Sequence, residues 1–400
     1  MVSTKKAFCH VKRPVLLSFV LLPLALLLTL FKPCPPLTVA REALYHPQSV
    51  LPLGPYFPFY QNGKTYLFGQ FSDRIDSHKH RKVVDNAANW WVINDDPSTG
   101  FAPVVKGAKM SSGQGVHSPF VLGGDNYIFS RHNQDWAWRI NDEATGIEPL
   151  PWSWGKSRAS VSYQAWVTFQ LNGVPYLLGL HSDVGANIWR IEKRAGGPRG
   201  SIGATLVKYK AQMSPNYKHL CAFYLDGHPY IFGVHKKETF GTSVDANIWR
   251  VKEGPSQGIE LELVMKGAEF SSAYDFVWPF QLGGRPYLFV AALTPESYPN
   301  DRLTLGVKIL ESLIKWEQCI YEPGKGYGAI WEIAGDPRSP SIRRISRAIP
   351  ISHRYYDLVT FEQGGKVYIF GVHEENYGNI WAVNEDPAKG FSLVYYGRNK

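Results

Sequence analysis

The sequence contains six internal repeats, and this periodicity restricts the possible fold more than any other feature. In each repeat a phenylalanine is followed seven residues later by a tyrosine, with a glycine-containing turn between them. The turn pairs tolerate the positive φ angles of a two-residue hairpin, so each unit predicts a β-hairpin. The phenylalanines are Phe59, Phe120, Phe169, Phe223, Phe280 and Phe361, and the tyrosines are Tyr66, Tyr127, Tyr176, Tyr230, Tyr287 and Tyr368.

A third strand with a central tryptophan and a fourth strand after a polar turn complete each repeat. Such a unit is too thin to bury both of its faces, but repetition at roughly 50 residues lets neighbouring sheets cover one another around a ring. We therefore predict an all-β fold, a six-bladed β-propeller of four-stranded antiparallel blades. We expect the repeated tryptophans to pack between adjacent sheets. They are Trp91, Trp138, Trp189, Trp249, Trp331 and Trp381.

The first 40 residues predict an export signal. Four basic residues, Lys5, Lys6, Lys12 and Arg13, precede an uncharged apolar run over residues 15–31. This run is long for a signal-peptide core and barely long enough for a bilayer span, so both a cleaved signal peptide and a signal anchor stay open. We expect residues 41–56 to be a lead-in segment and 57–400 to be the propeller. The protein is then secreted, or membrane-anchored with the propeller on the extracytoplasmic side.

Charge and cysteine content exclude two classes of protein. The net charge of +9 falls to +4 without the five basic residues of the first 40, so we expect no nucleic-acid partner. Contact with a membrane is expected only through the N-terminal segment, if it is uncleaved. Cys221 and Cys319 are the only cysteines of the sequence beyond that segment, which argues against a disulfide framework.

The length variation is concentrated in the loop between the second and third strands. The spacing from the repeated tyrosine to the repeated tryptophan is 25, 11, 13, 19, 44 and 13 residues. These loops emerge on one face of a propeller, which predicts that function lies there. Residues 72–82 form a basic loop that either contacts an anionic ligand or is merely solvated. The insert at 291–327 predicts a helix over 302–316, either a lid or a helix packed on the rim.

Histidine ends the second strand in four repeats, and asparagine opens the third strand in three of those four. This pattern predicts either a polar rim that binds ligand hydroxyls or a hydrogen bond repeated at each hairpin end. Tyrosines six residues before the phenylalanine lie in the same region, as packing caps or as site residues. The candidate ligand-binding residues are His132, His181, Asn187, His235, Asn247, His373, Asn379, Tyr217, Tyr274 and Tyr355.

No motif of a common enzyme or cofactor site is found. The sequence lacks HExxH, GxSxG, P-loop and CxxC patterns. We expect no metal, because zinc ligands must converge to about 2 Å from the ion, whereas second strands of neighbouring blades diverge. We also expect no cofactor. Catalysis would require residues from several blades, with Tyr163, Lys218, Asp275 and His353 as further candidates near the tyrosine positions.

Over residues 57–400 the repeat pattern resembles that of β-propeller lectins, including the tachylectin-type and bacterial fucose-binding propellers. Those proteins are likewise secreted, aromatic-rich and built of similar blades. Together with the His/Asn pattern, this resemblance leads us to expect a protein that binds glycans or other polyhydroxylated small-molecule ligands. The loop lengths predict that binding occurs on the face that carries the second-to-third strand loops. Two alternatives remain: a secretory-pathway enzyme of the lyase, cyclase or hydrolase type with one active site in the central funnel, and a protein-interaction scaffold.

Overall fold

The computed structural model describes residues 56–70, 74–76, 81–83, 87–110, 117–131, 135–154, 163–183, 185–194, 201–236, 245–255, 258–271, 274–293, 325–375 and 377–399. All of them belong to one compact unit, Ala43–Lys400. The predicted export signal lies outside the described residues, as do the lead-in segment up to residue 55 and the predicted helix over 302–316. Among the residues that are described, no helix is long and apolar enough to cross a bilayer.

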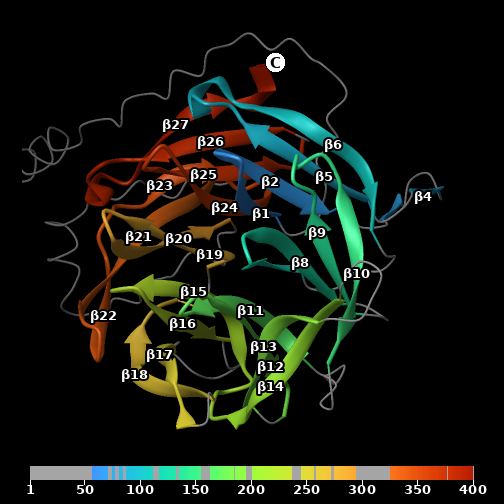
Figure 1. Cartoon of the computed structure of the whole chain (residues 1–400). Coiled ribbons are helices and arrows are strands. Elements are labelled where there is room, and N and C mark those ends of the chain that lie inside the picture. The colour runs from blue at the N-terminus through green and yellow to red at the C-terminus, as the bar shows by residue number, and fades with distance from the viewer. Residues whose placement is uncertain are drawn as a thin grey trace, which may run out of the picture. The chain divides into compact units, whose positions relative to one another are not determined.

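The chain forms a β-propeller-like arrangement of antiparallel four-stranded meanders, which follow one another in chain order around a ring (Figure 1). The first meander is β1 (Tyr56–Gln61), β2 (Lys64–Gln70), β5 (Ala87–Ile93) and β6 (Phe101–Lys109), and the second is β7 (His117–Leu122), β8 (Asp125–Arg131), β9 (Asp135–Ile140) and β10 (Ile147–Ser153). The third is β11 (Tyr163–Leu171), β12 (Val174–His181), β13 (Gly185–Arg194) and β14 (Ser201–Ala211).

The later meanders have the same strand order. The fourth is β15 (Tyr217–Leu225), β16 (His228–His235), β17 (Asp245–Glu253) and β18 (Ile259–Glu269). The fifth is β19 (Phe276–Leu282), β20 (Arg285–Ala292), β21 (Lys325–Asp336) and β22 (Ser339–Arg344), and the sixth is β24 (Tyr355–Gln363), β25 (Lys366–His373), β26 (Gly378–Val383) and β27 (Phe391–Tyr396). Short 3₁₀ turns η1 (Pro97–Thr99), η3 (Pro387–Lys389) and η4 (Gly397–Asn399) lie in the first and sixth meanders.

Hydrogen bonding groups these strands differently from the expected separate blades. The second and third meanders share one eight-stranded sheet, because β10 pairs in parallel with β14 through Trp152↔Ile202 and Ser153↔Gly203. The sheet of the fifth meander has five strands, because β21 extends beyond β22 and also pairs with β23 (Ile349–Ser352). The described strands therefore make three four-stranded sheets, one of eight strands, one of five and one two-stranded hairpin.

The predicted hairpins are confirmed in every meander. The repeated phenylalanine faces the repeated tyrosine across the first two strands, and the two rings stack, with centroids 4.9 Å apart for Phe59 and Tyr66. Both central turn residues have positive φ, for example 52° at Asn62 and 75° at Gly63. This left-handed conformation matches the twist of the strands, which is why Asn-Gly, Asp-Gly and Gly-Gly recur at this place.

The predicted packing of the third-strand tryptophans is also confirmed. Each lies in an apolar cluster that contains residues of the preceding meander; Trp189, for example, packs with Phe129 and Trp154. In the same way Trp91 of the first meander packs with Tyr56 and with Phe370 of the sixth. The apolar contact between neighbouring sheets is therefore continuous from the last meander back to the first.

Asp357 joins the two ends of the described propeller. Its carboxylate accepts the backbone N–H of Tyr56 at 2.7 Å and that of Leu358 at 2.8 Å, and so links β24 to β1. Burial raises the pKa of Asp357 to about 7, although the two backbone hydrogen bonds act in the opposite direction. The buried carboxyl group is thus more easily protonated in the folded protein than in the unfolded chain.

We predict that Asp357 makes stability fall as the pH rises. Its folded pKa lies above its unfolded value of 3.8, so its favourable contribution is complete below pH 3.8 and is lost as the pH rises through about 7. In this interval the slope should approach about 1.4 kcal/mol per pH unit. Asp357→Asn should flatten the slope in denaturant titrations, whereas Glu362→Gln, an exposed carboxylate on the same strand, should not. An unchanged slope in Asp357→Asn would contradict the assignment.

Candidate functional site

The residues proposed for a polar rim lie together in the third, fourth and sixth meanders. In the fourth, Asn247 Nδ2 donates to the Tyr217 hydroxyl at 3.0 Å and lies 3.0 Å from His235 Nε2. The Tyr217 and His235 rings are in contact, with centroids 4.3 Å apart. The equivalent groups are Tyr163, Asn187 and His181 in the third meander and Tyr355, Asn379 and His373 in the sixth.

The asparagine of each group also holds a bulge in the fourth strand. Asn247 Oδ1 accepts the Gly267 N–H at 3.0 Å, next to a shift in the pairing register between β17 and β18. Gly267 has a φ of 71°, a conformation that glycine adopts without strain. The corresponding donors are Lys210, Gly397 and Gly107, and their acceptors are Asn187, Asn379 and Asn89. Sequence reasoning missed Asn89, because its repeat has no histidine.

These groups are mostly buried, so their hydrogen-bonding atoms are used inside the protein. The asparagines are between 2% and 7% exposed, and burial raises the pKa of Tyr217 to about 12. His373 is buried, whereas His181 and His235 are partly exposed, and His132 lies outside the described residues. The hydrogen bonds at the hairpin ends are observed, while ligand binding by these residues stays a prediction.

The hydrogen bonds around a serine–histidine contact in the sixth meander indicate which ring nitrogen of the histidine carries the proton. Ser352 Oγ lies 3.0 Å from His373 Nε2, and His373 Nδ1 accepts the Glu375 N–H at 3.3 Å. Because Nδ1 is an acceptor, the proton of the neutral ring is on Nε2, which donates to the serine. Burial lowers the pKa of His373 to about 4 and keeps it neutral. A general base requires a free Nε2, so this pair is structural.

The charged candidates near Tyr274 stabilise the loop before β19. Lys218 Nζ donates to the Tyr274 carbonyl at 2.6 Å, and His219 Nε2 lies 2.7 Å from the same oxygen. Burial lowers the pKa of both side chains, to about 4 for His219. Asp275 Oδ2 accepts the Leu293 N–H at 2.7 Å. The contacts of Tyr274, Lys218 and Asp275 therefore order the backbone of this loop.

A cleft of about 500 Å³ opens at the other end of the strands, between the fifth and sixth meanders. Its lining includes the β19–β20 turn, Arg285 and Tyr287 of β20, and the loop at residues 385–388. Glu332 and Arg343, which pair across β21 and β22, also line it. Because the cleft is bordered by the turn between the first and second strands, it lies on the face opposite to the one predicted from loop lengths.

A buried carboxylate, Glu332, contacts Arg343 and Arg285 in this cleft. Glu332 Oε2 accepts hydrogen bonds from Arg343 Nε at 2.9 Å and Nη2 at 2.7 Å, and its Oε1 lies 3.9 Å from Arg285 Nη1. The Glu332 side chain is 9% exposed, whereas those of Arg343 and Arg285 are 70% and 74% exposed. The remaining N–H groups of Arg343 therefore face solvent in an orientation held by two hydrogen bonds to Glu332, whereas Arg285 approaches this carboxylate at the longer distance of 3.9 Å.

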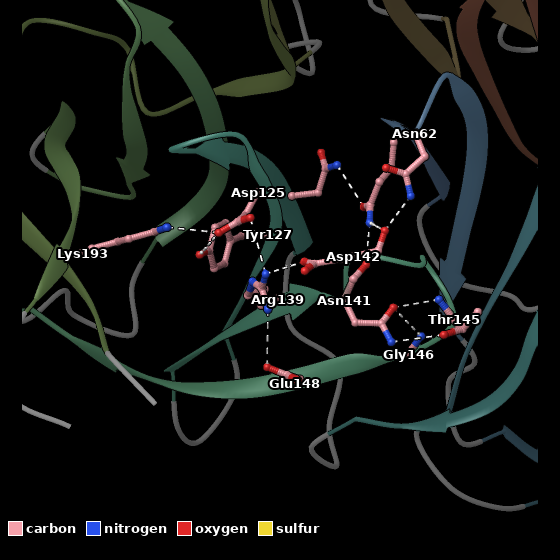
Figure 2. Close-up of polar contacts among 12 residues, drawn as sticks. Asn62, Asp125, Tyr127, Arg139, Asn141, Asp142, Thr145, Gly146, Glu148 and Lys193 are labelled. Carbon is pink, nitrogen blue, oxygen red and sulfur yellow. Dashed lines mark hydrogen bonds and ion pairs between the residues drawn. The ribbon is translucent and has the colours of Figure 1, made fainter. Parts of the chain in front are cut away.

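We call the boundary between two neighbouring meanders, at the end where their first-to-second strand turns lie, a seam. Elsewhere in the described ring, side-chain hydrogen bonds join the two meanders across this boundary. Between the second and third meanders, Lys193 Nζ contacts Asp125 at 3.0 Å, and Arg139 reaches the same carboxylate at 3.5 Å (Figure 2). Burial raises the pKa of Asp125, but the hydrogen bonds from Lys193 and Arg139 outweigh it and hold the pKa below its usual value. The other bonded seams are joined by Asn62 to Asp142, Asn172 to Glu253, Tyr230 to Pro337 and Gln363 to Asn94.

Within the described residues, no such bond joins the β19–β20 turn to the loop at 384–390, and the cleft lies at this place. The cleft residues were not among the sequence candidates, because each is an ordinary charged residue within one repeat. A comparison of charges at equivalent positions of all repeats would have singled them out.

The loops expected to carry function fall largely outside the described residues. Within 72–82, β3 (Arg74–Asp76) and β4 (Arg81–Val83) pair as a short antiparallel hairpin. The insert at 291–327 is described only at its two ends, up to Leu293 and from Lys325. The common face of these loops and the proposed lid therefore stay predictions. Among the described residues no group of three or more metal-binding side chains is found.

No protein-family model and no curated protein sequence match this chain. Similar solved structures include an alpha-L-arabinofuranosidase from Clostridium thermocellum, with 12% identity and a TM-score of 0.40 over 74% of this chain and 93% of that one. The SapL1 lectin in complex with alpha methyl fucoside has 9% identity and a TM-score of 0.45, over 86% and 96% of the two chains. Bacillus subtilis levansucrase has 9% identity and a TM-score of 0.41, over 70% and 85%. All three TM-scores are below 0.5, so no residue role is transferred from these proteins.

The structural role of the buried asparagines predicts a loss of stability on their removal. Asn247→Ala leaves the Gly267 N–H without its acceptor and the Tyr217 hydroxyl without its donor, and should cost about 1–3 kcal/mol of unfolding free energy. Asn216→Ala, at an exposed position shortly before β15, should change stability by less than about 0.5 kcal/mol. Chemical denaturation measures both values. Equal stability of the two variants would show that the Asn247 bonds contribute nothing.

Proposed function

We propose that this chain is an exported β-propeller that binds neutral polyhydroxylated ligands, glycans among them, in the cleft between the fifth and sixth meanders. The observation that carries the proposal is the pairing of Arg343 with the buried Glu332 in the lining of this cleft. The Arg343 guanidinium, held by Glu332, supplies donors, and the carboxylates of Glu385 and Asp386 supply acceptors. Two adjacent hydroxyl groups need a donor and an acceptor held close together, and this cleft has both.

This proposal moves the site from the face that loop lengths indicated to the opposite one. On the indicated face, the described members of the histidine and asparagine groups are largely bonded to one another. The polar side chains of the cleft, in contrast, keep exposed donors and acceptors. A preformed arrangement with little internal competition is favoured for ligand binding, since no existing hydrogen bond has to break.

We further propose that the ring has six blades, one for each meander. Six apolar clusters support this count, because each contains residues of two successive meanders and the series returns from the sixth to the first. The shared sheet of the second and third meanders is then a local contact of two outer strands. Export, with secretion or membrane anchoring, rests on the pattern of residues 1–40 alone.

The proposal predicts saturable binding of neutral glycans and its loss on changing Arg343. Calorimetric titration of residues 41–400 with a panel of neutral methyl glycosides and oligosaccharides should give one site per chain. Arg343→Gln keeps a donor for Glu332 but removes the guanidinium N–H groups that face the cleft, and should weaken binding at least about tenfold.

Arg338→Gln provides the matched control, because Arg338 is exposed on the β21–β22 turn of the same meander and outside the cleft. Thermal unfolding of both variants checks that the fold is retained. Absence of binding to every glycan in the panel by the folded wild-type protein would overturn the proposal. Turnover of a bound glycan would instead support the enzyme alternative.

A further inference from the structure

The closed seam of Figure 2 and the open seam at the cleft are built on the same four positions, with every charge reversed. The strand registers make Asp125 equivalent to Arg285, because each is the first residue after its hairpin turn. Arg139 and Glu332 each lie opposite the repeated tyrosine on the third strand. Their cross-strand partners on the fourth strand are Glu148 and Arg343.

The fourth position comes from the following meander: Lys193 lies within its third strand β13, and Glu385 lies two residues after its third strand β26. Lys193 lies three residues beyond Arg190, which faces Tyr176, and Glu385 lies three residues beyond Ala382, which faces Tyr368. In the closed seam the four positions hold Asp125, Arg139, Glu148 and Lys193. At the cleft they hold Arg285, Glu332, Arg343 and Glu385, so each acidic residue is replaced by a basic one and each basic residue by an acidic one. Because the sign of the charge is reversed at all four positions, each pair of opposite charges in one set corresponds to a pair of opposite charges in the other.

The two sets differ in one contact. In Figure 2 the chain of contacts is complete: Arg139 lies 3.8 Å from Glu148 and 3.5 Å from Asp125, and Lys193 closes the seam at 3.0 Å. At the cleft, Arg343 and Arg285 both contact Glu332, but no ion pair joins Arg285 to Glu385 in the described residues. The cleft is lined by both of these side chains, at the place where the closing contact would be.

We propose that Arg285 and Glu385 clamp the ligand across the seam and select a neutral diol over an acidic sugar. This inference rests on the proposed glycan-binding function. One hydroxyl accepts from Arg285 and its neighbour donates to Glu385, so that the ligand takes the place of the missing ion pair. The described residues that line the cleft include the carboxylates of Glu332, Glu385 and Asp386 and the guanidinium groups of Arg285 and Arg343, so a ligand carboxylate adds repulsion on the Glu385 side.

Matched sugars that differ only in a carboxylate test this selectivity. Methyl glucoside against methyl glucuronide, and methyl galactoside against methyl galacturonide, are titrated into the wild-type protein and into Glu385→Gln. The wild type should prefer the neutral member of the bound pair by at least about tenfold, and Glu385→Gln should reduce this preference to below about threefold. Glu385→Ala, which also removes the acceptor, should weaken binding of the neutral sugar at least about tenfold.

Glu253→Gln is the matched control, because Glu253 has the same register position in the fourth meander, where it accepts from Asn172 in a closed seam. It should leave affinity and selectivity unchanged. If the folded wild type binds none of the neutral sugars, the proposed function itself fails. If the wild type binds a neutral sugar but Glu385→Gln and Glu253→Gln have equal affinity and selectivity, the clamp is wrong and the binding function stands.

Discussion

Apolar contact between neighbouring sheets is the interaction on which the rest of this structure depends. A four-stranded sheet has two faces and cannot cover either by itself, so each meander is stable only against its neighbours. The third-strand tryptophan is the centre of this contact, as Trp249 shows by packing with Leu178 and Ile188 of the preceding meander. Because the last cluster joins Phe370 to Trp91, the sequence of contacts has no exposed end.

Polar side chains then determine how each seam is completed at the edges. The Asn–Tyr–His groups satisfy buried donors and acceptors at one end of the strands, and cross-seam bonds such as Lys193 to Asp125 join the other end. Both sets follow the repeat and serve the fold. The cleft departs from this pattern, because it has the charges of a closed seam without the closing contact. Sites that depart from the local rules of a fold are expected to be functional ones, which supports a binding role for this cleft.

The recurring histidines and asparagines show how a repeated pattern leaves two interpretations open in the sequence. Their regular recurrence was compatible with a repeated ligand rim and with a repeated structural bond. The structure shows the bond: Asn247 donates to Tyr217 and accepts from Gly267, which uses both ends of its amide. The Asn–Tyr–His groups occur in three of the six meanders, and in each of them the asparagine satisfies a backbone N–H at or just after the fourth strand.

The sequence by itself determined the hairpins, the strand order and the packing role of the tryptophans, because these depend on local turn chemistry and on a periodicity visible along the chain. Only the tertiary structure decided which polar groups form hydrogen bonds inside the protein and which stay exposed to solvent. Asp357 bonds to Tyr56 across 301 positions, and Glu385 lies 100 residues beyond Arg285, so neither relationship leaves a local pattern. Hydrogen-bond partners between meanders are set by register and ring closure, which come into existence only when the sheets pack.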